Sequence, residues 1–201
     1  MKERPILFNA QMVRALLDGS KTQTRRVMKG AALDWISTPT GFDPQFIADA
    51  ENRLCPYGQP GDRLWVRETW AIASKGTDLV KVYYSASERQ SHTEFHEYFP
   101  VSLAGHMPAT WPKYRPSIHM PRWASRITLE IVSVRVERLQ DISEGDAVAE
   151  GCIGGHGSIP GYQYAATPME HYHWLWNSIN GPSAWEKNPF VWCVEFKLVM
   201  P

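Results

Sequence analysis

The chain has 201 residues, which fits one domain or one domain with a large insertion and leaves little room for two independent cores. Its 21 basic residues balance 21 acidic ones, which argues against a protein that holds duplex nucleic acid on a broad basic face and still allows a small cationic pocket. No apolar run is long enough to cross a membrane, no secretory signal opens the chain, and three cysteines without C-x-x-C spacing favour reduced thiols. We therefore expect a cytoplasmic protein with no membrane contact.

The first predicted helix follows Asn9, a residue type that caps helices. Apolar residues recur at spacings of three and four from Met12 to Leu17, and Gly19 ends the pattern. Residues 20–28 follow as a polar, donor-rich loop that leads into a predicted strand. A loop that follows the end of a helix is a common place for functional side chains.

Two long segments have little periodicity. Residues 29–60 carry Gly, Pro, Asp and Asn throughout, and residues 86–122 are polar and broken by prolines, so both are interpreted as insertions outside the core. Between them, residues 63–70 and 80–84 alternate in character and predict two strands. The first of these strands has one polar and aromatic side.

The longest predicted strand runs from Ser125 to Leu139. Its apolar residues change phase by one position near residues 131–132, which indicates a bulge. A strand that changes face in this way is typical of a small closed barrel. Further helices are predicted after Ser143 and Thr167, and an apolar strand covers residues 190–198, so we expect an α+β domain around a compact barrel.

Glu150 lies at the end of the short helix that Ser143 opens and Gly151 stops. An anion in this position opposes the helix dipole, at a cost of about 0.3–1 kcal/mol. Another group should therefore stabilise the carboxylate of Glu150.

Four segments resemble the ASCH domain, a branch of the PUA-like β-barrel superfamily. They are residues 16–25, with the pattern G-x-K-T-x-T-x-R, residues 61–64, residues 142–151 and residues 191–196, in the order that the family has. The resemblance implies an α+β fold: a small PUA-like barrel with flanking helices, forming one domain over residues 1–201 with insertions at about 29–60 and 86–122. The long form resembles ASCH proteins of bacteriophages and prophages, which would work in the cytoplasm of a bacterial host.

The small bacterial enzymes of this family remove the acetyl group from N4-acetylcytidine. The resemblance assigns the catalytic roles to Lys21, Thr24 and Glu150 and implies no metal and no cofactor. Thr24 has a hydroxyl that can attack an amide, and such a hydroxyl needs a neighbouring base. Lys21 can be that base when neutral, or a cation that stabilises an oxyanion if Glu150 contacts it. Glu150 can protonate the leaving amine or orient a water.

The expected substrate is a modified nucleoside or RNA. Arg26 either contacts phosphate or pairs with an acid, and the aromatic candidates either stack on a base or pack in the core. His171 and His173 are two residues apart and without companion cysteines, so no metal site is expected. The candidate substrate-binding residues are Thr22, Arg25, Arg26, Trp65, Arg67 and Tyr84.

Two alternatives remain open at this stage. One is a PUA-like module that binds RNA or a nucleotide, with weak ribonuclease activity. The other is a phage protein whose insertions bind a protein partner. The sequence does not indicate the acyl group or the oligomeric state.

Overall fold

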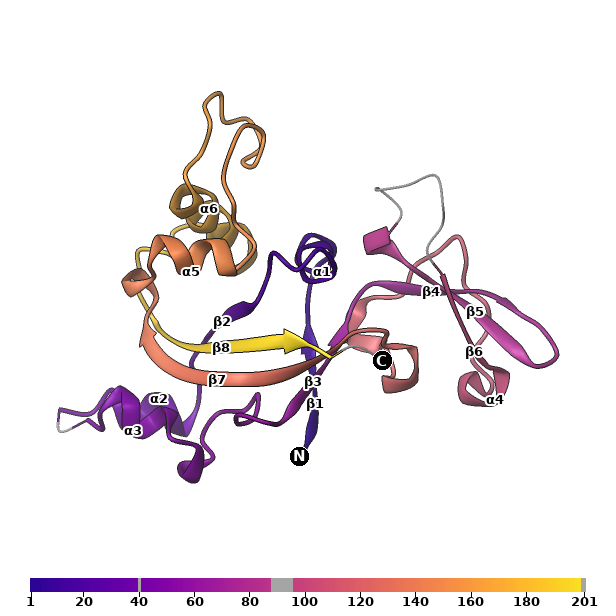
Figure 1. Ribbon diagram of the computed structural model, residues 1–201, viewed down its shortest axis with the longest axis horizontal. Helices are drawn as coiled ribbons and strands as arrows, with labels where there is room; N and C mark the ends of the chain where they lie inside the picture. Colours follow the sequence, from indigo (N-terminus) through magenta and orange to yellow (C-terminus); the bar gives the residue numbers. More distant parts are fainter. Residues whose placement is uncertain (40, 88–95, 200–201) are drawn as a thin grey trace.

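The computed structural model describes residues 1–39, 41–87 and 96–199, and it confirms a mixed α+β fold (Figure 1). One sheet has five strands in the order β1-β3-β7-β8-β2. Strand β1 runs parallel to β3, and the other neighbours are antiparallel. The strands are β1 (Glu3–Leu7), β2 (Gln23–Val27), β3 (Arg63–Arg67), β7 (Thr128–Arg138) and β8 (Phe190–Leu198).

The five-stranded sheet is open within the described residues. Strands β1 and β2 lie at its two edges and are not paired with each other, so no closed barrel is found in the part of the chain that the structure describes. The predicted bulge is confirmed, because the pairing of β7 with β8 shifts register between Ile131 and Ser133. A bulge bends and twists a strand whether or not the sheet closes, so the phase change alone does not establish a barrel.

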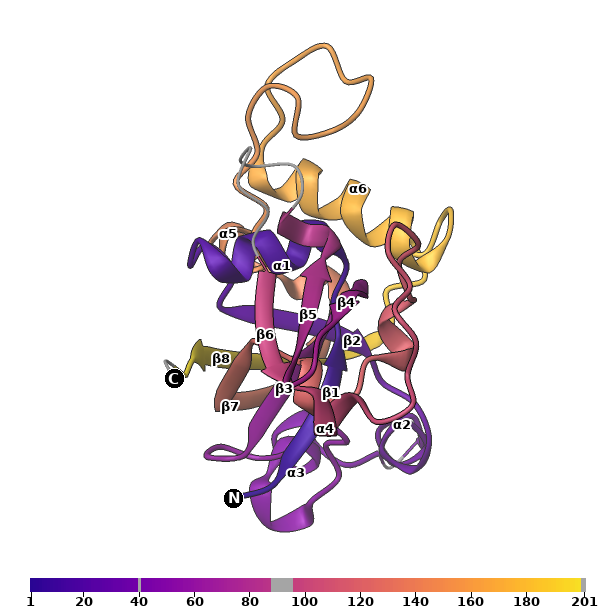
Figure 2. The same ribbon diagram turned by 90° about the vertical axis from the view of Figure 1, so that its right-hand side faces the viewer.

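A second sheet has three strands, β4 (Trp70–Lys75), β5 (Leu79–Tyr84) and β6 (His96–Pro100), in that order. It lies beside the first sheet (Figures 1 and 2). The strand predicted over 63–70 is divided between the two sheets at Glu68, whose buried carboxylate accepts a hydrogen bond of 2.8 Å from Arg126. Met120 is fully buried in the core of the second sheet, so the segment 86–122 contributes to a core, contrary to expectation.

Six α-helices accompany the sheets in the described residues: α1 (Ala10–Leu17), α2 (Ala31–Ile36), α3 (Pro44–Ala48), α4 (Val101–Ala104), α5 (Glu144–Ala149) and α6 (Pro168–Asn180). The predicted caps are confirmed, because Asn9 accepts a hydrogen bond from the backbone of Met12, and Ser143 forms a capping box with Asp146. None of the described helices has the length and apolar character that a bilayer crossing requires.

Helices α5 and α6 lie on one side of the β7–β8 pair, and α2 and α3 lie on the other side (Figure 1). Ile36 of α2 and Ile47 of α3 are buried in the same apolar cluster as the strands of the first sheet. The segment 29–60 therefore covers the sheet with two short helices. Strand β2 lies at the edge of the five-stranded sheet. Residues of α6 and residues 29–30 and 56–57 line one cavity together with β2.

Candidate functional site

A buried ion pair joins the loop before β2 to the end of α5. Lys21 Nζ lies 2.7 Å from Oε2 of Glu150 and 2.9 Å from the backbone oxygen of the same residue. The exposed fractions of the two side chains are 0% and 3%. An ammonium and a carboxylate at this depth are stable only when they satisfy each other, so each depends on its partner.

The backbone fixes this pair in place. Lys21 and Glu150 form an isolated antiparallel bridge, and the amide of Thr22 donates to the oxygen of Ala149 at 2.8 Å. Gly151 turns the chain with a positive φ of 88°, and a Cβ at this position would lie 3.0 Å from that of Ala15. The chain can therefore leave α5 close to α1 only with glycine at this position.

Arg25 extends the ion pair into a network. Its guanidinium lies 3.3 Å from Glu150 Oε1, 2.7 Å from Glu137 Oε1 through Nε, and 3.3 Å from Asp146. Burial alone would lower the pKa of Arg25, but the surrounding acidic groups, including Glu150 and Glu137, raise it above its usual value. The cations on either side of Glu150 offset the unfavourable dipole position that the sequence indicates.

Asp146 links the network to the cap of α5. It accepts hydrogen bonds of 2.9 Å from Gln23 and 2.8 Å from Ser143, and Arg135 lies 2.7 Å from it. Burial would raise the pKa of Asp146, but these hydrogen bonds and the charge of Arg25 hold that pKa well below its usual range.

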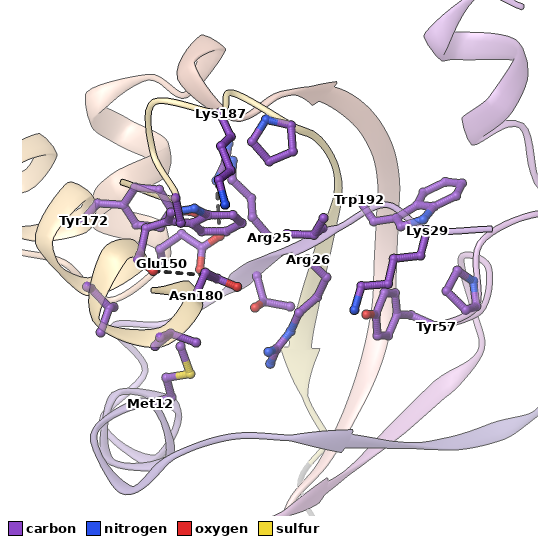
Figure 3. Close-up of a pocket in the computed structure, with 18 of the residues that line it drawn as sticks. Met12, Arg25, Arg26, Lys29, Tyr57, Glu150, Tyr172, Asn180, Lys187 and Trp192 are labelled. Carbon is purple, nitrogen blue, oxygen red and sulfur yellow. Dashed lines mark hydrogen bonds and ion pairs between the residues drawn. The ribbon is translucent and has the colours of Figure 1, made fainter. Parts of the chain in front are cut away.

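A cavity of about 670 Å³ opens beside this network, between β2, α6 and residues 56–57 (Figure 3). This volume is within the range of small-molecule sites, which is roughly 300–1,000 Å³. Figure 3 shows Tyr172, Glu150 and Asn180 on one side, Lys29 and Tyr57 on the other, and Arg26 between them. The lining residues are Met12, Thr24–Val27, Lys29, Gly30, Pro56, Tyr57, Glu150, Tyr172, Leu175, Trp176, Ile179, Asn180, Ala184, Lys187, Pro189 and Trp192.

Several polar atoms of this lining are buried without a hydrogen-bond partner in the protein. They include the hydroxyl of Tyr172, Nε1 of Trp176 and Nε of Arg26. Burial raises the pKa of Tyr172 well above its usual value, so the phenol is a neutral donor at physiological pH. Unpaired donors in an aromatic cavity fit a ligand that carries acceptors.

The structure brings together some of the residues predicted from the sequence. Thr24 and Glu150 both line the cavity, and Thr24 is 1% exposed. Lys21 bonds to Glu150 but is not among the lining residues, so its contribution passes through Glu150. Arg25 and Arg26 also line the cavity, whereas Thr22 is exposed and outside it.

Three predicted binding residues lie elsewhere. The guanidinium of Arg67 covers the ring of Trp65 at 5.0 Å on β3, and neither residue lines the cavity. Tyr84 is buried in the core of the second sheet, where its hydroxyl donates to the oxygen of Ala124 at 2.9 Å. For Tyr84 the structure therefore favours packing, the other of the two roles considered for the aromatic residues.

Part of the cavity wall comes from residues that no sequence pattern indicates. Tyr172 and Trp176 follow the helical spacing of a core face, and this spacing does not separate a residue that fills a core from one that lines a cavity beside it. Lys29 and Tyr57 fall in the segment interpreted as an insertion, and Lys187 in an irregular connection. Their proximity is set by long-range packing, for which the sequence has no local signal.

The described residues contain no cluster of three or more His, Cys, Asp or Glu side chains suited to a metal ion. All three cysteines have free thiols. Burial raises the pKa of Cys152 and of Cys193 to about 12, so neither thiol supplies a nucleophile at neutral pH.

Comparison of the chain with known protein families finds no match, and searches of curated proteins and of solved structures find none either. The function of the cavity must therefore be argued from its own geometry.

Proposed function

We propose that the chain is a long variant of the ASCH fold that removes the acyl group from N4-acetylcytidine or from a related modified nucleoside, without a metal. The observation that carries the proposal is that Thr24 and Glu150, which are distant in sequence, line one cavity of nucleoside size, with Lys21 bonded to Glu150 at 2.7 Å. Thr24 can serve as the nucleophile and Glu150 as the proton carrier in hydrolysis of an amide.

In the proposed reaction, the Thr24 hydroxyl attacks the acyl carbon and its proton passes to the Glu150 carboxylate. The C–N bond then breaks as Glu150 returns the proton to N4, which leaves cytidine and an acyl ester on Thr24. Water hydrolyses this ester to the free acid and restores the hydroxyl.

Lys21 contacts Glu150 directly, through both the carboxylate and the backbone oxygen of that residue. These contacts hold Glu150 in position, so Lys21 acts as a positioning residue for the carboxylate. Arg25, which also contacts Glu150, keeps this carboxylate from rotating away.

The test is hydrolysis of N4-acetylcytidine, followed by chromatography of cytidine and acetate. We expect turnover by the wild type, loss of activity to background in Thr24→Ala, and a decrease of about 10²–10⁴-fold in Glu150→Gln. Thr77→Ala changes an exposed turn of the second sheet and should keep full activity. Absence of wild-type turnover contradicts the substrate, and activity unchanged in Thr24→Ala contradicts the mechanism.

A second candidate function is binding of RNA or a nucleotide without hydrolysis. The observation that favours it is that Lys21 does not reach the cavity and is engaged by Glu150. This candidate predicts affinity that falls with salt and does not change in Thr24→Ala. The same variant therefore separates the two functions.

A further inference from the structure

The cavity has an excess of positive charge that the chain does not neutralise. Its only carboxylate is Glu150, and that group is already bonded to Lys21 and Arg25. Three further cations line the cavity, namely Arg26, Lys29 and Lys187, and none of them has a carboxylate partner in the described residues. In a chain whose net charge is zero, this local excess is a feature of the cavity and not of the overall composition.

Arg26 is the most informative of the three cations. One terminal nitrogen donates to the backbone oxygen of Leu7 at 2.7 Å, the guanidinium lies 5.2 Å from the ring centre of Phe8, and Nε is buried with no hydrogen-bond partner in the protein. A buried guanidinium nitrogen normally has a hydrogen-bond partner, and guanidinium groups bind anions especially well. Because no carboxylate of the described residues pairs with Arg26, a ligand is the natural partner of this group.

From this geometry we infer that the cavity binds the phosphate group of a nucleotide, with Arg26 and Lys29 as its cationic partners. A phosphate monoester carries about 1.5–2 negative charges at pH 7, which matches several cations better than a single carboxylate does. Tyr172, which lies on the same side of the cavity as Glu150 (Figure 3), supplies a ring surface against which a nucleobase can pack.

The orientation of the ligand follows from the two ends of the cavity. Lys29 and Tyr57 lie across the cavity from Glu150 and Tyr172, with Arg26 between the two groups (Figure 3). A base directed toward Glu150 therefore places its sugar phosphate toward Arg26 and Lys29, whereas Lys187 lies on the same side as Glu150 (Figure 3). The identity of the base rests on the proposed function, whereas the phosphate site rests only on the charges.

Calorimetric titration of the full chain with cytidine 5′-monophosphate and with cytidine tests the inference. We expect the monophosphate to bind at least about tenfold more tightly, since one charge-assisted contact is worth about that factor. Lys29→Gln and Arg26→Gln should each reduce this preference, Lys187→Gln should reduce it less, and higher salt should weaken it. Lys113→Gln, which removes an exposed lysine outside the cavity, should leave it unchanged.

Equal affinity for the two ligands, no binding of the monophosphate, or a preference that survives in both Lys29→Gln and Arg26→Gln would overturn the inference. A tetranucleotide containing cytidine identifies the source of the phosphate: tighter binding than the monophosphate, with the same dependence on the cations, assigns an RNA phosphodiester, and weaker binding assigns a free nucleotide. A preference for the monophosphate together with no hydrolysis of N4-acetylcytidine removes the proposed function and leaves the phosphate site in place.

Discussion

At the scale of single residues, Glu150 shows how a locally unfavourable position can be a sign of function. Its place at the end of α5 opposes the helix dipole, and a surface glutamate there would only destabilise the helix. In the structure its two carboxylate oxygens face Lys21 and Arg25, at 2.7 and 3.3 Å. Replacing a buried ion pair with apolar residues is often neutral or stabilising, so stability alone does not explain this arrangement.

Asp146 gives the residue-scale prediction of a pH effect. The pKa of this carboxyl is lower in the folded chain than its unfolded value of about 3.9, so its contribution to stability is present above that pH and is lost as the pH falls toward the folded pKa. Asp146→Asn should therefore lower the free energy of unfolding at pH 7, and the difference from the wild type should shrink as the pH falls from about 5 to 2.

Urea unfolding followed by circular dichroism at several pH values measures this difference. The control is Asp141→Asn, which changes an exposed carboxylate with no ion pair in the described part of the chain and should have little effect at any pH. A difference between Asp146→Asn and the wild type that stays constant across the pH range contradicts the prediction.

At the scale of elements, the junction between α5 and the loop before β2 depends on Gly151. The position combines a positive φ of 88° with close contact to Ala15 and Lys21. Gly155 has a similar φ of 93° and open space around its missing side chain. The two glycines therefore separate the cost of the backbone conformation from the cost of the contact.

We expect Gly155→Ala to cost about 1–2 kcal/mol, the penalty of a left-handed backbone with a Cβ. Gly151→Ala should cost clearly more, because its new methyl group has to displace Ala15 or Lys21. Gly151→Ala should also weaken hydrolysis or ligand binding, because a displaced Lys21 no longer holds Glu150 in place. Thermal unfolding of both variants measures the effect, and equal destabilisation would show that the contact with α1 is unimportant.

At the scale of the whole molecule, the two sheets have separate apolar clusters. Met120, Trp70 and Tyr84 belong to the cluster of the second sheet, and Leu129 belongs to that of the first. Cavity formation by Met120→Ala should cost about 2–5 kcal/mol. We expect this variant to lose hydrogen-exchange protection mainly in β4–β6, while the cavity beside β2 keeps its ligand affinity.

Hydrogen exchange followed by mass spectrometry tests this separation. Leu129→Ala is the matched variant, because Leu129 is equally buried and belongs to β7; its loss of protection should centre on β7 and β8. An even loss of protection across both sheets in Met120→Ala would show that the two clusters unfold as one unit.

Local sequence patterns predict individual helices and strands of this fold better than they predict which strands pair. The bulge near residue 132 and the caps at Asn9 and Ser143 follow from side-chain periodicity and capping chemistry, which act within a few residues. Strand β1 was not predicted, and the sheet does not close as a barrel in the described residues. Both depend on which strands become neighbours, and no pattern within a few residues of the sequence predicts that pairing.

The same difference applies to the candidate site. The family resemblance indicates Thr24 and Glu150, and the carboxylate of Glu150 at the C-terminal end of a helix is a second indication. Both residues line the cavity. Lys29 and Lys187 have no distinguishing pattern in the sequence, and both are exposed in the structure. Only the packing of α6 and of the segment 29–60 brings them to one cavity. Trp65 was a reasonable candidate by its alternation on a strand, but its strand lies away from that cavity.

The position of β2 at the edge of its sheet has a consequence for biosynthesis. Among the described strands it pairs with β8 alone, and Gln23 is separated from Cys193 of that strand by 170 residues. At about 5–20 residues per second, roughly ten to thirty seconds pass between translation of the two. During this interval the nascent strand that carries Thr24 exposes unpaired backbone groups, which other chains can bind. Ribosomes that stall before β8 should therefore yield fragments that aggregate or recruit chaperones.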